Sequence, residues 1–179
     1  RLDFDRPESI GKVSTFWGNF GMIVRAFVYS KMLGAEGMRQ TSEMAVLNAN
    51  YVTRKLEDVF DRPKQAQPMH EGVLSAAKQK ETSGVGALDI AKRLIDYGIH
   101  PPTIYFPLPR VCPEALLIEP TETESLEELD AFIDTMRKIA DEAETQPYLL
   151  KEAPHDTPVR RVDEATAARK PVLRWHPEA

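Results

Sequence analysis

Four histidines and one run of carboxylates are the residues of this chain whose types could support chemistry. The histidines are His70, His100, His155 and His176, and none has a second metal ligand at the helical spacing of three or four residues. We therefore predict no metal site. His70 and Glu71 fall inside a predicted strand, where neighbouring side chains point to opposite faces, so we expect no joint action. The simpler interpretation of His70 is a partly buried imidazole that hydrogen-bonds to backbone.

The carboxylates lie in the stretch Glu119–Ser125, between a predicted strand and a predicted helix. Negative charge and hydroxyl oxygens there stabilise the unpaired N–H groups of the helix N-terminus, and capping explains most of the stretch. Its three glutamates could also orient residues at the edge of a cleft. The sequence contains no Ser-His-Asp spacing, phosphate-binding glycine loop or dinucleotide motif. We therefore predict no self-contained active site.

Composition excludes several classes of function. The 23 basic residues against 28 acidic ones give a net charge of −5, which argues against nucleic-acid binding. The single cysteine, Cys112, cannot form an intrachain disulfide, and this suits a reducing compartment, so we expect a cytoplasmic protein. The apolar stretch Met22–Val28 is broken by Arg25 and is far shorter than the ~20 residues that cross a bilayer, so we expect no membrane association.

Apolar periodicity predicts four helices. The first covers Asn19–Leu33, ends at Gly34, and is apolar on so many sides that we expect nearly all of it to be buried. The second covers Glu36–Phe60 and presents one apolar face. The third helix ends at Tyr97-Gly98 and carries on one face Leu88, Ala91, Leu94 and Ile95. The fourth helix covers Ser125–Glu144, and Ser125 and Glu128 form a capping box at its start.

Three short segments predict a small antiparallel sheet. They are Met69–Ala76, Thr103–Phe106 and Ala115–Ile118, with a polar linker containing Gly84 and Gly86 after the first. The predicted fold class is α+β, a small antiparallel sheet covered by helices. We divide the chain into a connecting arm and helix at 1–35, a small α/β domain at 36–146, and an irregular docked tail at 147–179. Short helices are expected in the tail near 149–153 and 163–169, and the tail ends near Trp175.

Several motifs, taken together and in order, resemble one family. They are Asn48-Ala49-Asn50-Tyr51, Met69-His70-Glu71, the run Leu88–Thr103 containing Asp96-Tyr97-Gly98-Ile99-His100-Pro101-Pro102, and Glu119-Pro120-Thr121-Glu122-Thr123-Glu124. The family is glycine dehydrogenase (decarboxylating), the P-protein of the glycine cleavage system. The tail segments Ala153-Pro154-His155 and Arg169–Trp175 look like the end of subunit 2 of the bacterial two-subunit form.

The resemblance implies the C-terminal small domain of a fold-type-I pyridoxal-phosphate enzyme. In that family the cofactor supports decarboxylation of glycine, and the aminomethyl group passes to the lipoyl arm of H-protein. The family's Schiff-base lysine follows a histidine, whereas the histidines here precede Glu71, Pro101, Asp156 and Pro177. We therefore expect no catalytic residue in this chain, no covalently bound cofactor, and no activity in isolation.

The resemblance also suggests how the chain contributes to a larger enzyme. A small domain in this fold closes one wall of the cleft, and the candidates for that wall are residues at predicted strand ends within the matching motifs: His70, His100, Thr103, Thr121 and Glu122. The implied partners are glycine dehydrogenase subunit 1 and lipoyl H-protein.

A stand-alone binding or regulatory module is the alternative. The chain opens at Arg1 without an initiator Met or a signal sequence, so we expect a piece of a longer protein rather than a free module. The apolar helix Asn19–Leu33 supports the same interpretation. In the isolated chain this helix should drive self-association or bind a neighbouring chain.

Overall fold

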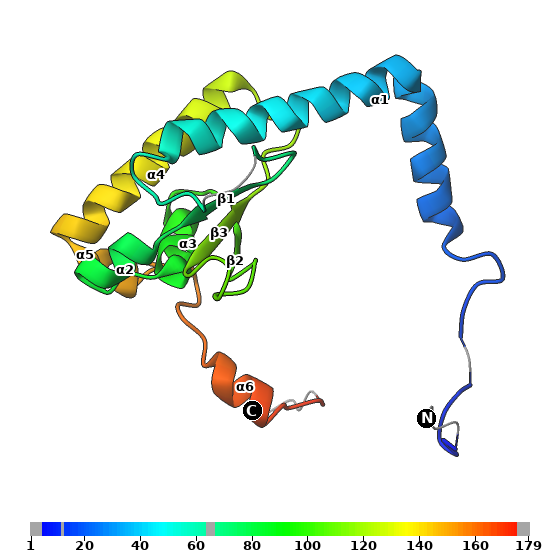
Figure 1. Ribbon diagram of the computed structural model, residues 1–179. Helices are drawn as coiled ribbons and strands as arrows, with labels where there is room; N and C mark the ends of the chain where they lie inside the picture. Colours follow the sequence, from blue (N-terminus) through cyan, green and yellow to red (C-terminus); the bar gives the residue numbers. More distant parts are fainter. Residues whose placement is uncertain (1–4, 12, 64–66, 175–179) are drawn as a thin grey trace. The chain divides into compact units, whose positions relative to one another are not determined.

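The computed structural model describes residues 5–11, 13–63 and 67–174 (Figure 1). Trp175 and His176, which the sequence places at the end of the tail, lie outside the described residues. The chain divides into two compact units, Arg1–Thr41 and Ser42–Ala179. The predicted three-part division into arm, domain and tail stays a prediction.

The first unit contains an arm and the start of helix α1, which covers Phe20–Leu56. Gly34 interrupts this helix with a φ of 62° and a ψ of −174°, so the predicted break at Gly34 is confirmed. Glycine fits there because it lacks the Cβ that disfavours positive φ. The expected burial of the first stretch is wrong: Phe20 and Phe27 remain 76% and 63% exposed. The arm before Phe20 forms no described helix or strand that could cover them.

The second unit is built on a three-stranded antiparallel sheet, as predicted. Its strands are β1 (Gly72–Ser75), β2 (Thr103–Ile104) and β3 (Ala115–Ile118), in the order β1-β3-β2. Two strands are shorter than expected. Met69 and His70 lie in a bend before β1, and Tyr105 adopts a φ of 60°, which turns the chain away from an extended conformation after β2.

Five further helices in the described residues complete this unit. They are α2 (Ala77–Ser83), α3 (Ala87–Asp96), α4 (Leu126–Thr145), α5 (Pro147–Lys151) and α6 (Glu164–Arg169). The prediction of a polar linker after the first strand is wrong in part, because α2 forms there. Only Gln79 of α2 is buried, so the segment carries no apolar periodicity that would reveal a helix.

Helix α4 begins with the predicted capping box. The Ser125 hydroxyl accepts a hydrogen bond from the Glu128 amide at 3.2 Å, and the Glu128 carboxylate accepts one from the Ser125 amide at 2.9 Å. The buried face of α4 contains Leu129, Ile133 and Met136.

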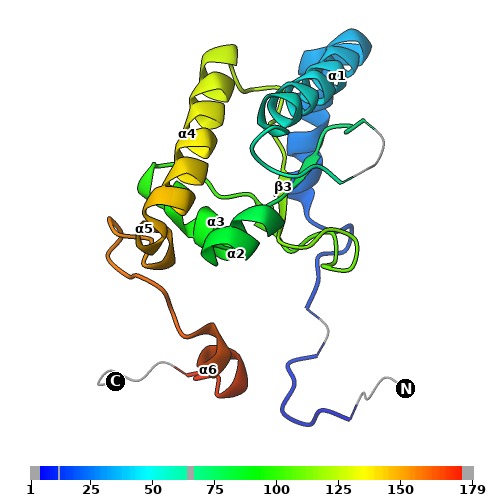
Figure 2. The ribbon, with the colours of Figure 1, turned by 60° about the vertical axis from the view of Figure 1, so that its left-hand side comes forward.

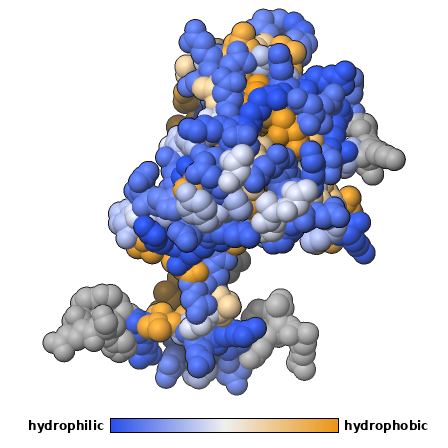
Figure 3. Space-filling model, turned by 90° about the vertical axis from the view of Figure 1, so that its left-hand side faces the viewer, coloured by the Kyte–Doolittle hydropathy of each residue, from blue (hydrophilic) through white to orange (hydrophobic). Residues whose placement is uncertain are grey.

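The molecular face in Figure 3 is mostly hydrophilic, with limited apolar areas.

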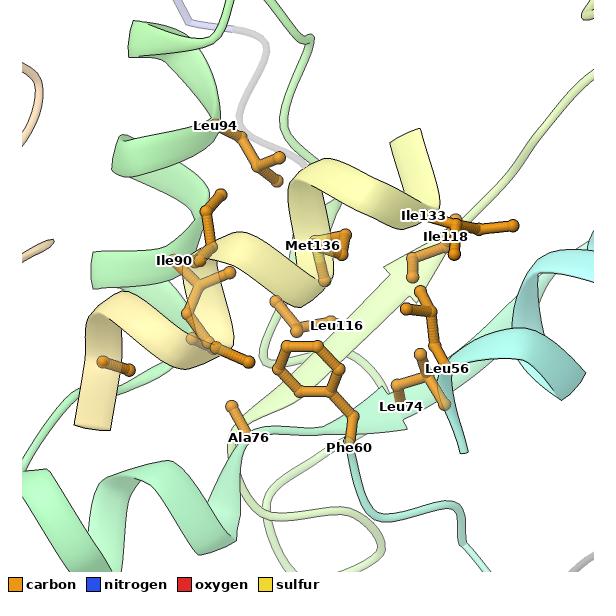
Figure 4. Close-up of a cluster of buried hydrophobic side chains, with 14 of the residues drawn as sticks. Leu56, Phe60, Leu74, Ala76, Ile90, Leu94, Leu116, Ile118, Ile133 and Met136 are labelled. Carbon is orange, nitrogen blue, oxygen red and sulfur yellow. The ribbon is translucent and has the colours of Figure 1, made fainter. Parts of the chain in front are cut away.

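The core lies where the end of α1, the sheet and helices α3 and α4 meet. Figure 4 shows Phe60 among Leu56, Ala76 and Leu116, and all four are at most 1% exposed. Figure 2 shows α4 beside the C-terminal part of α1, and the Tyr51 hydroxyl joins the two helices by donating a hydrogen bond to Asp130 at 2.6 Å. No helix of the described chain is long and apolar enough to span a membrane.

Helix α1 and the sheet approach closely at Gly72. A Cβ placed there would overlap the Oγ1 atom of Thr53, which is itself 2% exposed, and would also touch the Ala49 carbonyl. The first residue of β1 therefore lies against the Thr53 side chain of α1, and no larger side chain fits there without a shift.

We expect Gly72→Ala to lower the free energy of unfolding by about 1–3 kcal/mol, because the extra methyl group overpacks this contact. Adding Thr53→Ala should restore part of the loss, since it removes the overlapping hydroxyl. Urea unfolding of the single and double variants measures both effects.

Gly98→Ala is the matched control. Gly98 has a φ of 71° with no heavy atom within 4 Å of the added Cβ, so its cost is backbone strain alone. Thr53→Ala should not relieve that cost. Equal rescue of both glycine variants would contradict the close-contact explanation.

Candidate functional site

Sheet register brings the predicted site residues to one end of the sheet. Strands β1 and β2 both run antiparallel to β3, with Gly72 opposite Ile118 and Thr103 opposite Leu117. The starts of β1 and β2 and the exit of β3 therefore share one end, called here the polar end. The candidates there are His70 before β1, His100 and Thr103 at the start of β2, and Thr121 and Glu122 after β3.

Two asparagines of α1 hold the two loops at the polar end. Asn48 donates a hydrogen bond from Nδ2 to the Thr121 carbonyl at 2.8 Å. Asn50 donates from Nδ2 to the Pro68 carbonyl at 2.8 Å and to the Val46 carbonyl at 2.7 Å. One helix therefore fixes both the segment that enters β1 and the segment that leaves β3.

The sequence-based choice of site residues omitted both asparagines. It selected strand-end residues within the motifs, whereas Asn48 and Asn50 lie on a helix. One signal in the sequence could have found Asn48: it is a polar residue on the apolar face of a helix. In the structure Asn48 is only 4% exposed. A buried amide without a partner is costly, so its position on that face indicates a specific hydrogen bond elsewhere.

His70 and Glu71 lie side by side, contrary to the expectation from strand alternation. His70 Nε2 is 3.4 Å from Glu71 Oε1, because both residues precede β1 and escape its alternation. One ligand atom from each of these residues and from Glu119 lies within 4.8 Å of the others. The group is open to solvent, with His70 and Glu119 exposed and Glu71 half-buried. The predicted absence of a metal site stays a prediction.

His100 lies in a tight corner between α3 and β2. The amides of Gly98 and Ile99 donate to the carbonyls of Ile95 and Leu94 at 2.9 and 3.0 Å, so backbone already caps the end of α3. The imidazole is exposed and makes no side-chain hydrogen bond within the described part of the chain. Capping of α3 by His100 is therefore not needed.

The remaining candidates differ in burial. Thr103 is exposed on β2, and Thr121 is exposed with its Oγ1 2.7 Å from Thr123 Oγ1. Glu122 is half-buried. The structure thus places the candidates at one end of the sheet but joins only some of them by direct contacts.

The charged residues of the motif on α3 serve the fold rather than the polar end. Arg93 makes a two-pronged ion pair with Glu142 of α4, at 2.9 and 3.1 Å, and a third contact with Asp96 at 3.1 Å. Tyr97 donates to Glu142 at 2.5 Å. These side chains join α3 to α4 through charge-assisted hydrogen bonds.

The same motif also holds the tail. Asp96 accepts the backbone amides of His155 and Asp156 at 2.5 and 3.2 Å. Asp89 pairs with Arg161 at 2.8 Å, and Arg161 also donates to the Ala153 carbonyl at 2.8 Å. Acidic residues of α3 therefore fix the chain that follows α5.

The pKa values of the two carboxyl groups follow from these contacts. Burial alone would raise the pKa of Glu142, but hydrogen bonds from Arg93 and Tyr97 outweigh burial and lower it. Burial likewise opposes the net lowering of the Asp96 pKa, which comes from the amides of His155 and Asp156 and from Arg93.

None of the described lysines is built to hold pyridoxal phosphate as a Schiff base. Lys92 is half-buried, and the other described lysines are exposed at positions 31, 55, 78, 80, 138, 151 and 170. A Schiff-base lysine is usually desolvated, whereas these side chains are exposed or half-buried. The predicted absence of a covalently bound cofactor stays a prediction.

Fold and register together define an α+β domain whose candidate residues share one end of a small antiparallel sheet. A sequence profile for the C-terminal domain of glycine dehydrogenase matches residues 41–156. The chain belongs to this family, so the resemblance drawn from the motifs is confirmed.

Curated relatives agree with this assignment. Two proteins named probable glycine dehydrogenase (decarboxylating) subunit 2, from Oceanobacillus iheyensis and Caldanaerobacter subterraneus, are 60% and 58% identical over 98% and 97% of the chain. A protein of the same name from Pyrococcus abyssi is 53% identical over 97% of the chain. The chain spans only 35–36% of the length of these relatives.

Acid should destabilise the chain through Asp96 and Glu142. Folding lowers the pKa values of both carboxyl groups. Their contribution to the free energy of unfolding is therefore fully present above their pKa values in the unfolded chain, about 3.9 for Asp and 4.3 for Glu. It is lost as the pH falls through the lower folded values. We expect the free energy of unfolding to fall as the pH drops below about 5.

Glu142→Gln should remove part of this pH dependence and lower stability at pH 7 by about 2 kcal/mol, because Arg93 loses a charged partner. Urea unfolding at several pH values measures both changes. Glu144→Gln, an exposed change on the same helix, is the control. If Glu142→Gln keeps the full acid dependence, the ion-pair explanation is wrong.

Proposed function

We propose that this chain is the C-terminal domain of a pyridoxal-phosphate-dependent glycine decarboxylase and forms one wall of its glycine-binding cleft. The observation that carries the proposal is the convergence of His70, His100 and the Glu119–Glu122 segment at the polar end. Membership of the glycine dehydrogenase family and the names of the relatives support the reaction.

The cofactor is held outside the described residues in this proposal. Bound pyridoxal phosphate supplies the electron sink for loss of the glycine carboxylate, and the aminomethyl group goes to the lipoyl arm of H-protein with release of CO₂. The polar end contributes cleft shape, polarity and exclusion of water. The chain by itself should therefore be inactive and bind no cofactor covalently.

The partners follow from the same proposal. The relatives are named as subunit 2, which supports a partner subunit 1. H-protein is the proposed acceptor, and the cytoplasm is the proposed compartment. No nucleic acid or membrane partner is proposed, since the net charge of −5 offers phosphates no broad basic face.

The first unit fits a role in docking to the rest of the polypeptide. Met22, Val28, Tyr29 and Met32 line an open apolar groove on the first stretch of α1. Large exposed apolar patches usually mark interaction surfaces. The relatives are almost three times as long as this chain, so we propose that their additional residues cover this helix and that the isolated chain self-associates through it. A free-standing regulatory module is the less favoured function, because it would leave this surface uncovered.

His100 tests the proposal against a purely structural role. In full-length subunit 2 assembled with subunit 1, His100→Ala should lower glycine decarboxylation with H-protein by about tenfold or more. The melting temperature should stay close to that of the unmodified enzyme, because the ring is exposed and α3 is capped by backbone.

His155→Ala is the matched control. The His155 ring nitrogen lies 2.8 Å from the Leu149 carbonyl, so this change should lower stability by about 1 kcal/mol and leave the activity of the folded enzyme intact. If His100→Ala lowers the melting temperature and leaves decarboxylation unchanged, His100 does not belong to the cleft wall.

A further inference from the structure

We propose that Asn48 is a positioning residue that holds the loop Glu119–Glu124 where Thr121 and Glu122 can line the cleft. The inference rests on the proposed function and deepens it, because it names a residue of α1 that acts on the site through another segment. Asn48 belongs to none of the strand ends that supply the cleft-wall candidates.

The first support is the burial and bonding of the Asn48 amide. The residue is 4% exposed, and its Nδ2 donates to the Thr121 carbonyl at 2.8 Å across 73 positions of sequence. A buried side-chain amide with no hydrogen bond to water or to this carbonyl would lower the free energy of unfolding. The loop is therefore tied to one site on α1.

The second support is the way the loop is otherwise held. Its start follows β3 at Ile118, and its end runs into the capping box of α4 at Ser125. Between these ends, two hydrogen bonds are local: the Glu124 amide donates to the Thr121 carbonyl at 3.3 Å, and the hydroxyls of Thr121 and Thr123 meet at 2.7 Å. Among the hydrogen bonds of the described loop, Asn48 supplies the one from a distant element. At the start of the loop, a Glu119 oxygen also lies within 4.8 Å of ligand atoms of His70 and Glu71.

The third support is chemical. The Thr121 carbonyl accepts hydrogen bonds and cannot donate them, so the partner on α1 must carry an N–H or O–H group. Asparagine supplies that donor in a short side chain without charge. An ionised aspartate at position 48 would have the same shape but would place a second acceptor against the carbonyl.

Asn50 provides an internal comparison. It lies two residues further along α1 and donates to the Pro68 carbonyl, on the segment that precedes His70 and Glu71. Residues two apart project to different sides of a helix. Asn48 and Asn50 therefore act on different loops, and their effects on Glu122 should differ.

The experiment is a double-mutant cycle in full-length subunit 2 assembled with subunit 1, with glycine decarboxylation in the presence of H-protein as the readout. Glu122→Gln and Asn48→Ala should each lower kcat/KM for glycine by about tenfold, equivalent to roughly 1.4 kcal/mol. The kcat/KM of the double variant should be no more than about twofold below that of Glu122→Gln alone. Once Glu122 has lost its role, correct placement of the loop by Asn48 no longer affects the rate. Asn50→Ala combined with Glu122→Gln should instead show the product of the two single losses.

Asn48→Asp keeps the side-chain shape and guards against a folding defect in Asn48→Ala. It should show the same loss and the same non-additivity, whereas an Asn48→Asp enzyme with unchanged kcat/KM would overturn the proposal. Independent, multiplying losses for Asn48 and Glu122 would also overturn it while leaving the cleft wall intact. If Glu122→Gln and Thr121→Ala both leave activity unchanged, the proposed wall fails together with the positioning residue.

Discussion

The close packing of α1 on the first residue of β1 is the contact on which the polar end depends. Because Gly72 has no side chain, β1 can begin against the Thr53 side chain and near the Ala49 carbonyl. Because α1 and β1 are so close, short asparagine side chains of the helix reach the neighbouring loops. Asn48 and Asn50 each hydrogen-bond to one of these loops. A larger residue at position 72 would push the helix away and put both carbonyl partners out of reach.

The charged residues of the domain separate into two groups with different roles. Arg93, Asp96 and Glu142 lie between α3, α4 and the tail, where they make several short contacts each. His70 and His100 are exposed at the polar end. Buried charges need partners, whereas exposed polar groups are free to meet a ligand or another surface. Burial and partners therefore distinguish structural from functional candidates within motifs that look equally informative in sequence.

Much of the fold could be predicted from sequence because its signals are local. The capping box at Ser125, the positive φ at Gly34 and the strand Ala115–Ile118 follow from residue type and short spacing. Helix α2 was missed because it buries only Gln79 and so lacks a periodic apolar face. The burial expected for the first stretch of α1 was wrong, since apolar periodicity says that a surface seeks a partner but not which segment provides it.

The candidate site was predictable in its location but not in its connections. Strand-end positions within the motifs were enough to select His70, His100 and Glu122, and antiparallel register then places them at one end. The contact of His70 with Glu71 depends on a bend before β1, and the bond from Asn48 joins residues 73 positions apart. Neither has a short-range signature in the sequence.

Amide hydrogen exchange tests most directly whether α1 fixes the two loops of the polar end. In the present chain, Asn48→Ala should speed exchange in residues 119–124 and leave residues 67–71 unchanged, whereas Asn50→Ala should do the reverse. Amides in the middle of α4 should stay protected in both variants. Unchanged exchange in both loops, or an equal increase throughout the domain, would contradict the account.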